Sequence, residues 1–311
     1  MSKASLLIAL CTHNPRPEFI AETLASLRAQ DLPTTGWDLL VVDNASSPPL
    51  SGRLDLSWHP SARIVREERL GIAPARVCAL REFTAGSADL LLFIDDDNLL
   101  APDYLRVGLA IAAREPRLGC WGGQLLPRFL APPPDWIGPF LKYLAIFPLQ
   151  HELRLARFAG NYDPVPPTAG MFLRRDVALH YLELVASAPT RLALGGDSRL
   201  RIGGEDMDLA LTALDLGFEL ARLPSLTLTH LIPPSRLTEE YIATLLRGAA
   251  AGSAILSTLR GTRPVLHPTW RRWWLRLRAR RLPPRHRRFL EAQLDGEVLA
   301  RRILRTQPPA A

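Results

Sequence analysis

Along the first hundred residues, short apolar runs that end in polar residues alternate with stretches of helical periodicity. Four runs have the length and composition of buried strands: 5–10, 37–42, 61–65 and 89–94. Between them, apolar side chains recur at helical spacing from Phe19 to about Gln30, and again up to Phe83. Strands that alternate with helices in this way are typical of parallel sheets covered on both faces. We therefore expect an α/β fold with a mostly parallel central sheet.

The fourth apolar run leads directly into three consecutive carboxylates, Asp95, Asp96 and Asp97. Open α/β sheets bind their ligands outside the carboxyl ends of the strands, which is where this triplet would lie. Adjacent like charges repel, so the triplet needs a counter-charge, and a divalent cation bound through oxygen is the obvious one. An acidic turn that caps the next helix, with Asn98 or Asp103 as the cap, is the alternative that the sequence leaves open.

Beyond residue 103 the pattern predicts less regular structure. Apolar spacing predicts a helix over 104–114, and residues 119–123 read as a strand that leads into a glycine turn. Residues 127–167 are rich in proline and aromatic residues, which predicts a long loop of the kind that is functional or mobile. Trp136 or Tyr143 in this loop could stack on a sugar or a lipid, although packing within the protein is the commoner role.

A second group of acids stands at the start of a predicted helix, directly after Gly203 and Gly204. Glu205, Asp206 and Asp208 all fall in its first turn, where acids suit the helix dipole without any catalytic role. Residues two apart on a helix diverge, so Asp206 and Asp208 cannot both point into one site.

Several arginines stand near the ends of predicted elements. Arg76 lies in the first turn of the helix after Gly71, where it could reach a phosphate or the acid triplet, and an ordinary surface position fits equally well. Arg174 and Arg175 follow a short apolar strand and are expected to be exposed, with a weaker claim to contact an acceptor or a phosphate.

The positive charge of the chain is concentrated in its C-terminal part. The net charge is +7, yet the residues from Arg263 onward hold 13 arginines and three acids, so the preceding residues total −3. Within that part, four apolar residues share one face of a predicted helix whose other positions are mostly arginine: Trp270, Trp273, Trp274 and Leu277. This pattern suits the surface of an anionic membrane. Docking of the same face on the catalytic domain or on a second subunit remains open, whereas no nucleic-acid recognition motif accompanies the arginines.

Composition narrows the class of protein. The 311 residues are 47% hydrophobic and 22% charged, which allows one large or two small folded domains and argues against disorder. The three cysteines are far apart and form no disulfide or zinc pattern, so a reducing cytoplasm fits best. The most apolar long stretch, 241–259, is broken by Arg247 and is not predicted to span a membrane. No G-x-G-x-x-G follows the first strand, which counts against a dinucleotide cofactor.

Four segments in a fixed order then suggest a family. They are CTHN after the first strand, VVDNAS after the second, RLGIAPAR before the second helix, and FIDDDNLLAPDYL. Their order and spacing, over about the first 105 residues, resemble the family 2 glycosyltransferases, which have the Rossmann-like GT-A fold. The resemblance implies a nucleoside-diphosphate sugar donor, with a UDP-sugar favoured. It also implies transfer of the sugar, with inversion, to a hydroxyl of a glycan or lipid-linked glycan in polysaccharide biosynthesis.

The resemblance also implies roles for individual residues. Asp206 would be the catalytic base and Glu205 its supporting neighbour, while Asp97 would hold Mn²⁺ (or Mg²⁺) against the diphosphate. His230, at a strand end where a lone histidine is more often structural, would complete the metal site. The residues implied to bind the nucleotide and donor are Thr12, Asn14, Asp43, Arg76, Asp95, Asp96 and Gly170. An Arg or Gln that often follows the base along its helix is not evident here.

These observations predict three parts of the chain. Residues 1–105 would bind the nucleotide sugar, 106–234 would hold the acceptor and the catalytic base, and 235–311 would form a helical, Arg- and Trp-rich extension. We expect a cytoplasmic protein, peripheral on the inner face of the membrane through 270–288, with a homodimer through the C-terminal helices as a further expectation. Two other classes stay open: a nucleotidyltransferase, although no Gly-rich basic loop follows the first strand, and a non-catalytic sugar-nucleotide-binding protein at the membrane.

Overall fold

The computed structural model describes residues 5–195 and 201–306. Its strands are β1 (Leu6–Thr12), β2 (Trp37–Asn44), β3 (Ala62–Glu67), β4 (Leu90–Asp95), β5 (Asn98–Leu100), β6 (Leu118–Phe129), β7 (Leu153–Leu155), β8 (Met171–Arg174) and β9 (Glu219–Ile232). Its α-helices are α1 (Pro17–Arg28), α2 (Ile72–Ala85), α3 (Tyr104–Arg114), α4 (Arg175–Ser187), α5 (Glu205–Asp215), α6 (Glu239–Leu259), α7 (Thr269–Ala279) and α8 (Pro284–Thr306). Short 3₁₀ helices are η1 (Thr34–Gly36), η2 (Asp135–Leu144), η3 (Pro189–Ala193) and η4 (Pro234–Arg236).

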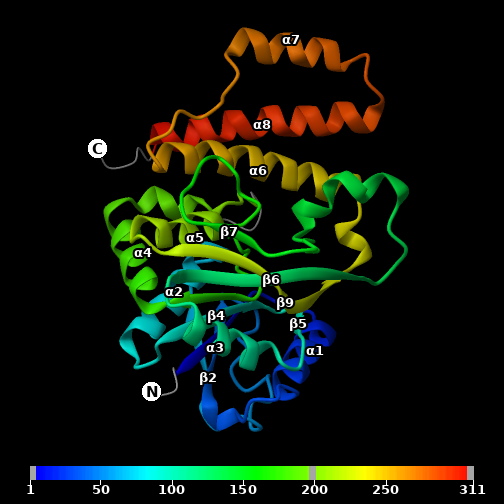
Figure 1. Ribbon diagram of the computed structural model, residues 1–311. Coiled ribbons are helices and arrows are strands. Elements are labelled where there is room, and N and C mark those ends of the chain that lie inside the picture. Colours follow the sequence, from blue (N-terminus) through cyan, green and yellow to red (C-terminus); the bar gives the residue numbers. More distant parts are fainter. Residues whose placement is uncertain (1–4, 196–200, 307–311) are drawn as a thin grey trace.

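One mixed sheet forms the centre of the molecule, with helices on both of its faces (Figure 1). Its strand order is β3-β2-β1-β4-β8-β6-β9-β5, and β7 pairs with β9. The first four strands are parallel and are the four predicted from the apolar runs, which are confirmed to within two residues at each end. Thr12 lies opposite Asp43, and Cys11 lies opposite Asp95. The polar ends of these strands therefore meet at one edge of the sheet.

The core has one layer on each face of the sheet, because successive side chains of a strand point to opposite sides. Leu6 and Ile8 of β1 pack beneath α1 and α3. Leu7 and Ala9 of the same strand pack beneath α2, α4 and α5. All four side chains are buried. The α/β architecture predicted from the sequence is thus the observed one, with antiparallel strands in its second half.

Two predictions for the middle of the chain are wrong. Gly122 and Gly123 do not form a turn but lie inside β6, at a shift in its register with β9. A Cβ atom on Gly123 would overlap the backbone of Leu226, so the strands need glycine there to approach. Residues 127–167 are also not simply a loop, because they hold the end of β6, all of η2 and β7.

The aromatic residues of that segment pack within the protein. The Trp136 ring lies 6.0 Å from the Phe289 ring, and the Arg285 guanidinium lies 4.7 Å from the Trp136 ring. Tyr143 packs against the same apolar cluster. Packing, the commoner of the two roles considered for these side chains, is therefore the one that the structure shows.

Arg174 and Arg175 have structural roles, and the expectation that they are exposed is wrong. The Arg174 guanidinium donates to the carbonyl of Ala112, near the end of α3, at 2.8 Å, and to that of Leu118 at 2.6 Å. The Arg175 guanidinium donates to the carbonyls of Phe83 and Thr84, in the last turn of α2, at 3.0 and 2.9 Å. Carbonyls at the end of a helix lack intrahelical partners, and each arginine supplies donors for one helix.

The C-terminal helices lie together on one side of the sheet, with α6 between the sheet and α8 and with α7 outermost (Figure 1). Thr238 caps α6 by accepting a hydrogen bond from the Tyr241 amide at 3.2 Å. By length and composition alone α6 could cross a membrane, and 44% of its apolar window is buried in the protein. Trp270 and Trp273 of α7 are 70% and 66% exposed, so the alternative that they dock on the catalytic domain is wrong.

Candidate active site

The predicted site residues come from both halves of the chain. The Asp95–Asp97 triplet follows β4 at the carboxyl edge of the parallel strands, and Arg76 lies on α2 beside it. Glu205 and Asp206 open α5, and His230 lies on β9, where it pairs in register with Asn98. The antiparallel contact between β5 and β9 carries His230 to the acid triplet, although more than 130 residues separate them in the sequence.

Arg76 connects the triplet to the second group of acids. Its guanidinium donates to the Glu205 carboxylate through Nη1, and its Nη2 lies 3.5 Å from Oδ1 of Asp95. Arg76 is only 7% exposed, so the alternative that it is a surface arginine is wrong. Because Asp206 neighbours Glu205 on the chain, one buried cation faces acids from β4 and from the start of α5.

The two acids at the start of α5 are less acidic than free carboxyls. Burial raises the pKa of Glu205, an effect that the Arg76 guanidinium opposes and the neighbouring Asp206 charge adds to. Burial likewise raises the pKa of Asp206, and Arg76 again opposes it. A raised pKa brings a carboxylate nearer to the range in which it accepts a proton effectively. These environments suit a general base, and Arg76 keeps the pair from becoming fully protonated.

The start of α5 is held in place by glycines and by a buried ion pair. Gly204 precedes the helix with φ +103°, a backbone angle that favours glycine, and Cβ atoms on Gly248 or Gly252 of α6 would overlap the backbone of 201–203. Asp208 is fully buried and pairs with Arg191. It therefore points away from Asp206, as the helical spacing predicted. Because these α6 positions are glycines, α6 packs directly against residues 201–203, which precede Asp206 in the chain.

The two predicted metal ligands lie together. Oδ2 of Asp97 is 3.5 Å from Nε2 of His230, and both side chains are buried. Arg236 of η4 contacts both: its Nη2 donates to Oδ2 of Asp97 at 2.6 Å, and its Nη1 lies 2.9 Å from Nε2 of His230. Burial raises the pKa of Asp97, but His230 and Arg236 outweigh it and lower the pKa to about 2.

The donor set of this pair fits a divalent cation. An imidazole nitrogen and a carboxylate oxygen are common ligands of Mn²⁺, and Nε2 of His230 lies 3.5 Å from Oδ2 of Asp97. The atoms that would bind the ion are those that Arg236 now contacts. Within 5–195 and 201–306, no group of three His, Cys, Asp or Glu side chains is arranged to hold a metal. A bound cation would thus complete its shell with substrate phosphates and water.

Asp96, the middle acid, points elsewhere. Its Oδ2 accepts a hydrogen bond from the Thr12 hydroxyl at the end of β1. Burial and the neighbouring Asp97 charge raise the pKa of Asp96 to about 7, although the Thr12 bond opposes this. The three acids therefore have three different partners: Arg76 for Asp95, Thr12 for Asp96, and Arg236 with His230 for Asp97.

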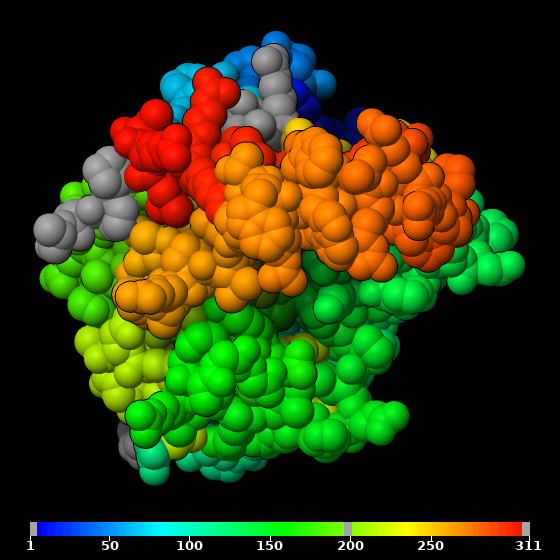
Figure 2. Space-filling view, turned by 90° about the horizontal axis from the view of Figure 1, so that it is seen from above, coloured from blue at the N-terminus to red at the C-terminus, as the bar shows by residue number. Residues whose placement is uncertain are grey.

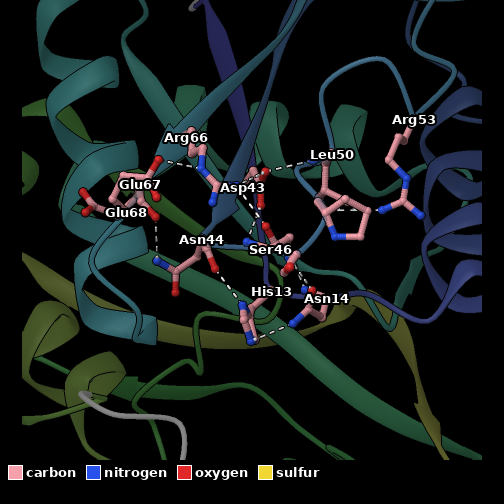
Figure 3. A network of polar contacts seen from close by, with 12 residues as sticks. His13, Asn14, Asp43, Asn44, Ser46, Leu50, Arg53, Arg66, Glu67 and Glu68 are labelled. Carbon is pink, nitrogen blue, oxygen red and sulfur yellow. Dashed lines mark hydrogen bonds and ion pairs between the residues drawn. The ribbon is translucent and has the colours of Figure 1, made fainter.

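The loops after β1 and β2, predicted to line a nucleoside pocket, are bonded to each other (Figure 3). The backbone N–H of Asn14 donates to the Ser46 hydroxyl at 2.9 Å, and the side-chain Oδ1 of Asn14 accepts from the backbone N–H of Ser47 at 2.8 Å. Asp43 is 1% exposed, and its carboxylate accepts from the Ser46 and Leu50 amides and from Arg66.

Those bonds give Asp43 a structural task. Burial would raise the pKa of its carboxyl, but the hydrogen bonds and Arg66 lower it. A bound base would have to replace one of these bonds to touch Asp43. Of Thr12, Asn14 and Asp43, Asn14 is the exposed one, whereas the other two are buried. Nucleoside contact by Thr12, Asn14 and Asp43 stays a prediction.

Gly170 needs to be glycine for packing within the protein. Its φ is +80°, and a Cβ atom there would overlap the hydroxyl of Tyr104, which donates to the Gly170 carbonyl at 2.6 Å. The Gly170 amide donates to the carbonyl of Phe93 at 2.9 Å, two residues before the triplet. Gly170 thus lies beside the end of β4, and a direct contact with donor remains a prediction.

Sequence reasoning missed Arg236. It lies six residues after His230, behind two prolines, in a stretch without periodicity. Its only signal is a basic residue shortly after a strand that ends in a candidate ligand. Its contacts with Asp97 and His230 arise from the turn that η4 makes beyond β9.

Comparisons with known proteins concern the family and the fold. The sequence profile of the family described as "Glycosyl transferase family 2" matches residues 7–129. A search of the curated proteins found no match. Among solved structures, TarS (residues 1–349) of S. aureus in complex with UDP-GlcNAc superimposes with a TM-score of 0.54 at 12% identity, covering 96% of this chain and 92% of that one.

Two further structures show the same fold. TarS of S. aureus in complex with UDP has a TM-score of 0.53 at 14% identity, covering 96% of this chain and 91% of that one. GalNAc-T7 with UDP, GalNAc and Mn²⁺ has a TM-score of 0.54 at 14% identity, covering 98% of this chain and 58% of that one. At such identities the likeness concerns the fold alone, and the predicted GT-A architecture is confirmed.

Proposed function

We propose a reaction for this chain from one premise: residues 7–129 are a glycosyl transferase family 2 domain, so the protein is a glycosyltransferase. The donor is a UDP-sugar, as in the solved structures of similar fold that hold UDP or UDP-GlcNAc. The acceptor is a hydroxyl of a glycan or lipid-linked glycan, and the sugar is transferred with inversion in polysaccharide biosynthesis. The cytoplasm, at the inner face of the membrane, is the proposed location.

In this reaction Asp206 removes the proton of the acceptor hydroxyl as its oxygen attacks the anomeric carbon. The bond from that carbon to the diphosphate oxygen breaks, and its electron pair leaves with the nucleoside diphosphate. Burial raises the pKa of Asp206, which improves it as a base, while Arg76 keeps it ionised before the attack. Glu205 holds Arg76 in place and so positions the charge that Asp206 faces.

Asp97 and His230 are the residues that would hold Mn²⁺ (or Mg²⁺), as their side-by-side position supports. When bound, a divalent cation there supplies positive charge to the leaving diphosphate. Asp95 lies on the ribose side of the donor, and Thr12 fixes Asp96. Among the structures of similar fold, GalNAc-T7 is described with Mn²⁺.

One observation carries the proposal: the Arg76 guanidinium touches both the donor-side acid Asp95 and the base-side acid Glu205. These acids are 110 residues apart in the sequence. A structural ion pair needs only one of them. A cation shared between the end of β4 and the start of α5 supports a base at Asp206 beside the proposed donor position.

The test is transfer or hydrolysis of a panel of nucleotide sugars with Mn²⁺ present, together with donor binding by thermal shift. Asp206→Asn should lower turnover by about a thousandfold or more while leaving donor binding nearly unchanged, since general-base catalysis contributes about 10²–10⁴. Asp97→Ala should instead weaken Mn²⁺-dependent donor binding.

The matched control is Asp176→Asn, because Asp176 also lies in the first turn of a helix but is exposed on α4. It should keep full activity. Normal turnover by Asp206→Asn would show that another group is the base. Failure of every UDP-sugar to bind or turn over, with another nucleotide sugar accepted, would show that the proposed donor class is wrong.

A further inference from the structure

Helix α7 presents an apolar face that nothing in the described structure covers. Three of its residues are tryptophans, Trp270, Trp273 and Trp274, which are 70%, 66% and 42% exposed, and Leu277 between them is 44% exposed. They recur at the spacing of one helical face. Ala279, on the opposite side of α7, is buried where this helix packs on α8. The tryptophans therefore point away from the protein.

Arginines flank this apolar face on both sides. At about 100° per residue, Arg271 and Arg278 lie on one side of the tryptophan stripe and Arg276 and Arg280 on the other. Each of these four arginines is exposed. Of the four, Arg276 pairs with an acid, Asp295 of α8, at 2.5 Å.

Most cations of this face lack acidic partners. Residues 269–288 hold nine arginines and no acid. Among the described residues, no ion pair joins an acid to five of them: Arg271, Arg272, Arg278, Arg280 and Arg281. The Arg278 guanidinium lies instead 4.6 Å from the ring of Trp274. The face thus offers uncompensated positive charge beside exposed indole rings.

The position of α7 leaves this face accessible. It is the outermost helix, separated from the sheet by α8 and α6 (Figure 1), and it lies uncovered across the molecule when seen from that side (Figure 2). The chain returns from α7 through Arg285 and Arg288 of α8, which pair with Glu239 at the start of α6. That start follows η4, which carries Arg236, so the Arg-rich end of the helical extension lies near the candidate active site.

We propose that α7 is a membrane-docking helix, whose tryptophan face enters the interface of a bilayer while its flanking arginines bind anionic lipid phosphates. Indole rings are favoured at the headgroup level of membranes, and a helix with one aromatic face and a basic polar face lies in the plane of the interface. Anionic headgroups supply the negative charge that the protein itself does not place there.

A second copy of the chain fits this face less well. In a two-fold dimer each helix would meet the same face of its partner, so arginines would lie against arginines with no acid between them. Like charges so placed repel, and a nearby Asp295 is already paired. A nucleic acid would satisfy the arginines but would leave the tryptophan face without an apolar environment. The charge pattern therefore favours lipid.

The test is sedimentation of the full-length protein with vesicles of phosphatidylcholine alone or mixed with phosphatidylglycerol. The protein should bind the anionic vesicles, and high salt should weaken binding because it screens the arginines. Trp270→Ser/Trp273→Ser should reduce binding about tenfold or more because it removes the inserted face. Arg271→Gln/Arg278→Gln should reduce it roughly 25-fold, at about fivefold for each arginine.

Matched controls change the same residue types elsewhere on the surface. Leu179→Ser/Leu216→Ser removes two exposed apolar side chains, 44% and 41% exposed, and Arg114→Gln/Arg117→Gln removes two exposed arginines. Both controls should bind vesicles as the wild type does. Vesicle binding needs no donor sugar, so this result is independent of the proposed glycosyl transfer.

Two outcomes would overturn the proposal. The wild type could fail to bind anionic vesicles, or the α7 variants could bind them as well as the controls do. In the absence of vesicle binding, a dimer that Trp270→Ser/Trp273→Ser dissociates in analytical ultracentrifugation would assign the face to a second copy. A duplex DNA oligonucleotide bound by the wild type and lost by Arg271→Gln/Arg278→Gln, again without vesicle binding, would assign it to nucleic acid.

Discussion

Replacing Arg76 by glutamine tests whether the structure places a necessary charge between the two groups of acids. Arg76 is 7% exposed, and the side chain of its partner Glu205 is 11% exposed. Glutamine keeps most of the volume but leaves Glu205 and Asp95 without the cation. Breaking a buried pair by removing one partner costs about 3–5 kcal/mol, because an uncompensated charge stays buried. We expect Arg76→Gln to lower the free energy of unfolding by that amount.

An exposed pair between β3 and α2 provides the matched control. Arg63 pairs with Glu82 at 2.6 Å, but these side chains are 44% and 38% exposed. Water and salt screen such pairs, whose contribution is about 0.2–1 kcal/mol. Arg63→Gln should therefore cost less than about 1 kcal/mol. The difference between the two variants isolates the effect of burial, because the residue change and the type of pair are the same.

The assay is urea unfolding of the wild type, Arg76→Gln, Glu205→Gln and the double variant. The double variant should be more stable than Arg76→Gln alone, because it also removes the Glu205 charge, which the single variant leaves buried without a cation. The midpoint concentrations should shift without a change in slope. Equal destabilisation by Arg76→Gln and Arg63→Gln, or strict additivity in the cycle, would refute the reasoning that Arg76 holds a buried charge balance.

Three further predictions concern neighbouring parts of the site. Gly170→Ala should destabilise the protein by about 2–4 kcal/mol, because the new Cβ would overlap the Tyr104 hydroxyl and the residue has a positive φ. Gly138→Ala, where a Cβ would meet open space, should leave the stability unchanged. Equal urea midpoints for the two variants would contradict this. Arg236→Gln should tighten donor-free Mn²⁺ binding, measured by electron paramagnetic resonance, because the guanidinium contacts the proposed ligand atoms; unchanged or weaker binding would count against it. Because the pKa of Asp206 is raised, kcat/KM of the wild type should begin to fall with decreasing pH at a pH above the ordinary aspartate pKa of about 4. Arg76→Gln removes the charge that opposes this rise, so the fall in kcat/KM should move to higher pH. An unmoved profile would argue against Asp206 as the base.

The part of the fold that sequence patterns predicted well is the parallel half of the sheet. Each of its strands is buried on both faces, so it is a continuous apolar run that polar residues end abruptly, as at Asp43 and Asp95. The helices between them repeat apolar residues at their own period. Both signals are local, and α3, predicted from just after Tyr104 to about Arg114, is observed at Tyr104–Arg114 for the same reason.

Predictions failed where a residue's role depends on a distant segment. Gly122 and Gly123 signal a turn locally, but β9 approaches β6 so closely that only glycine fits. Arg174 and Arg175 look exposed at a strand end, yet their guanidinium groups reach the ends of α3 and α2. Arg236 carries no pattern at all. No local periodicity encodes contacts between residues 60 to 140 positions apart.

The counter-charges of the acid triplet were predicted from sequence only in part. The adjacent charges predicted a counter-charge for the cluster, and the family resemblance then assigned the metal to Asp97 and His230 alone. In the structure the three carboxylates diverge, and separate groups neutralise or bind them: Arg76, the Thr12 hydroxyl, and Arg236 with His230. A metal ion held here would then be shared by Asp97 and His230 rather than by all three acids.

This division of partners separates the two tasks that the site has to perform. Asp97 faces the side where leaving-group charge would be neutralised under the proposal, while Asp95 faces Arg76 and, through it, Glu205 beside the proposed base. A donor that displaces Asp95 would change the field at Asp206, because the same guanidinium faces both acids. We therefore expect the basicity of Asp206 to depend on whether the donor site is filled. Because Arg76 contacts both acids, replacing Arg76 should make the basicity of Asp206 independent of donor binding.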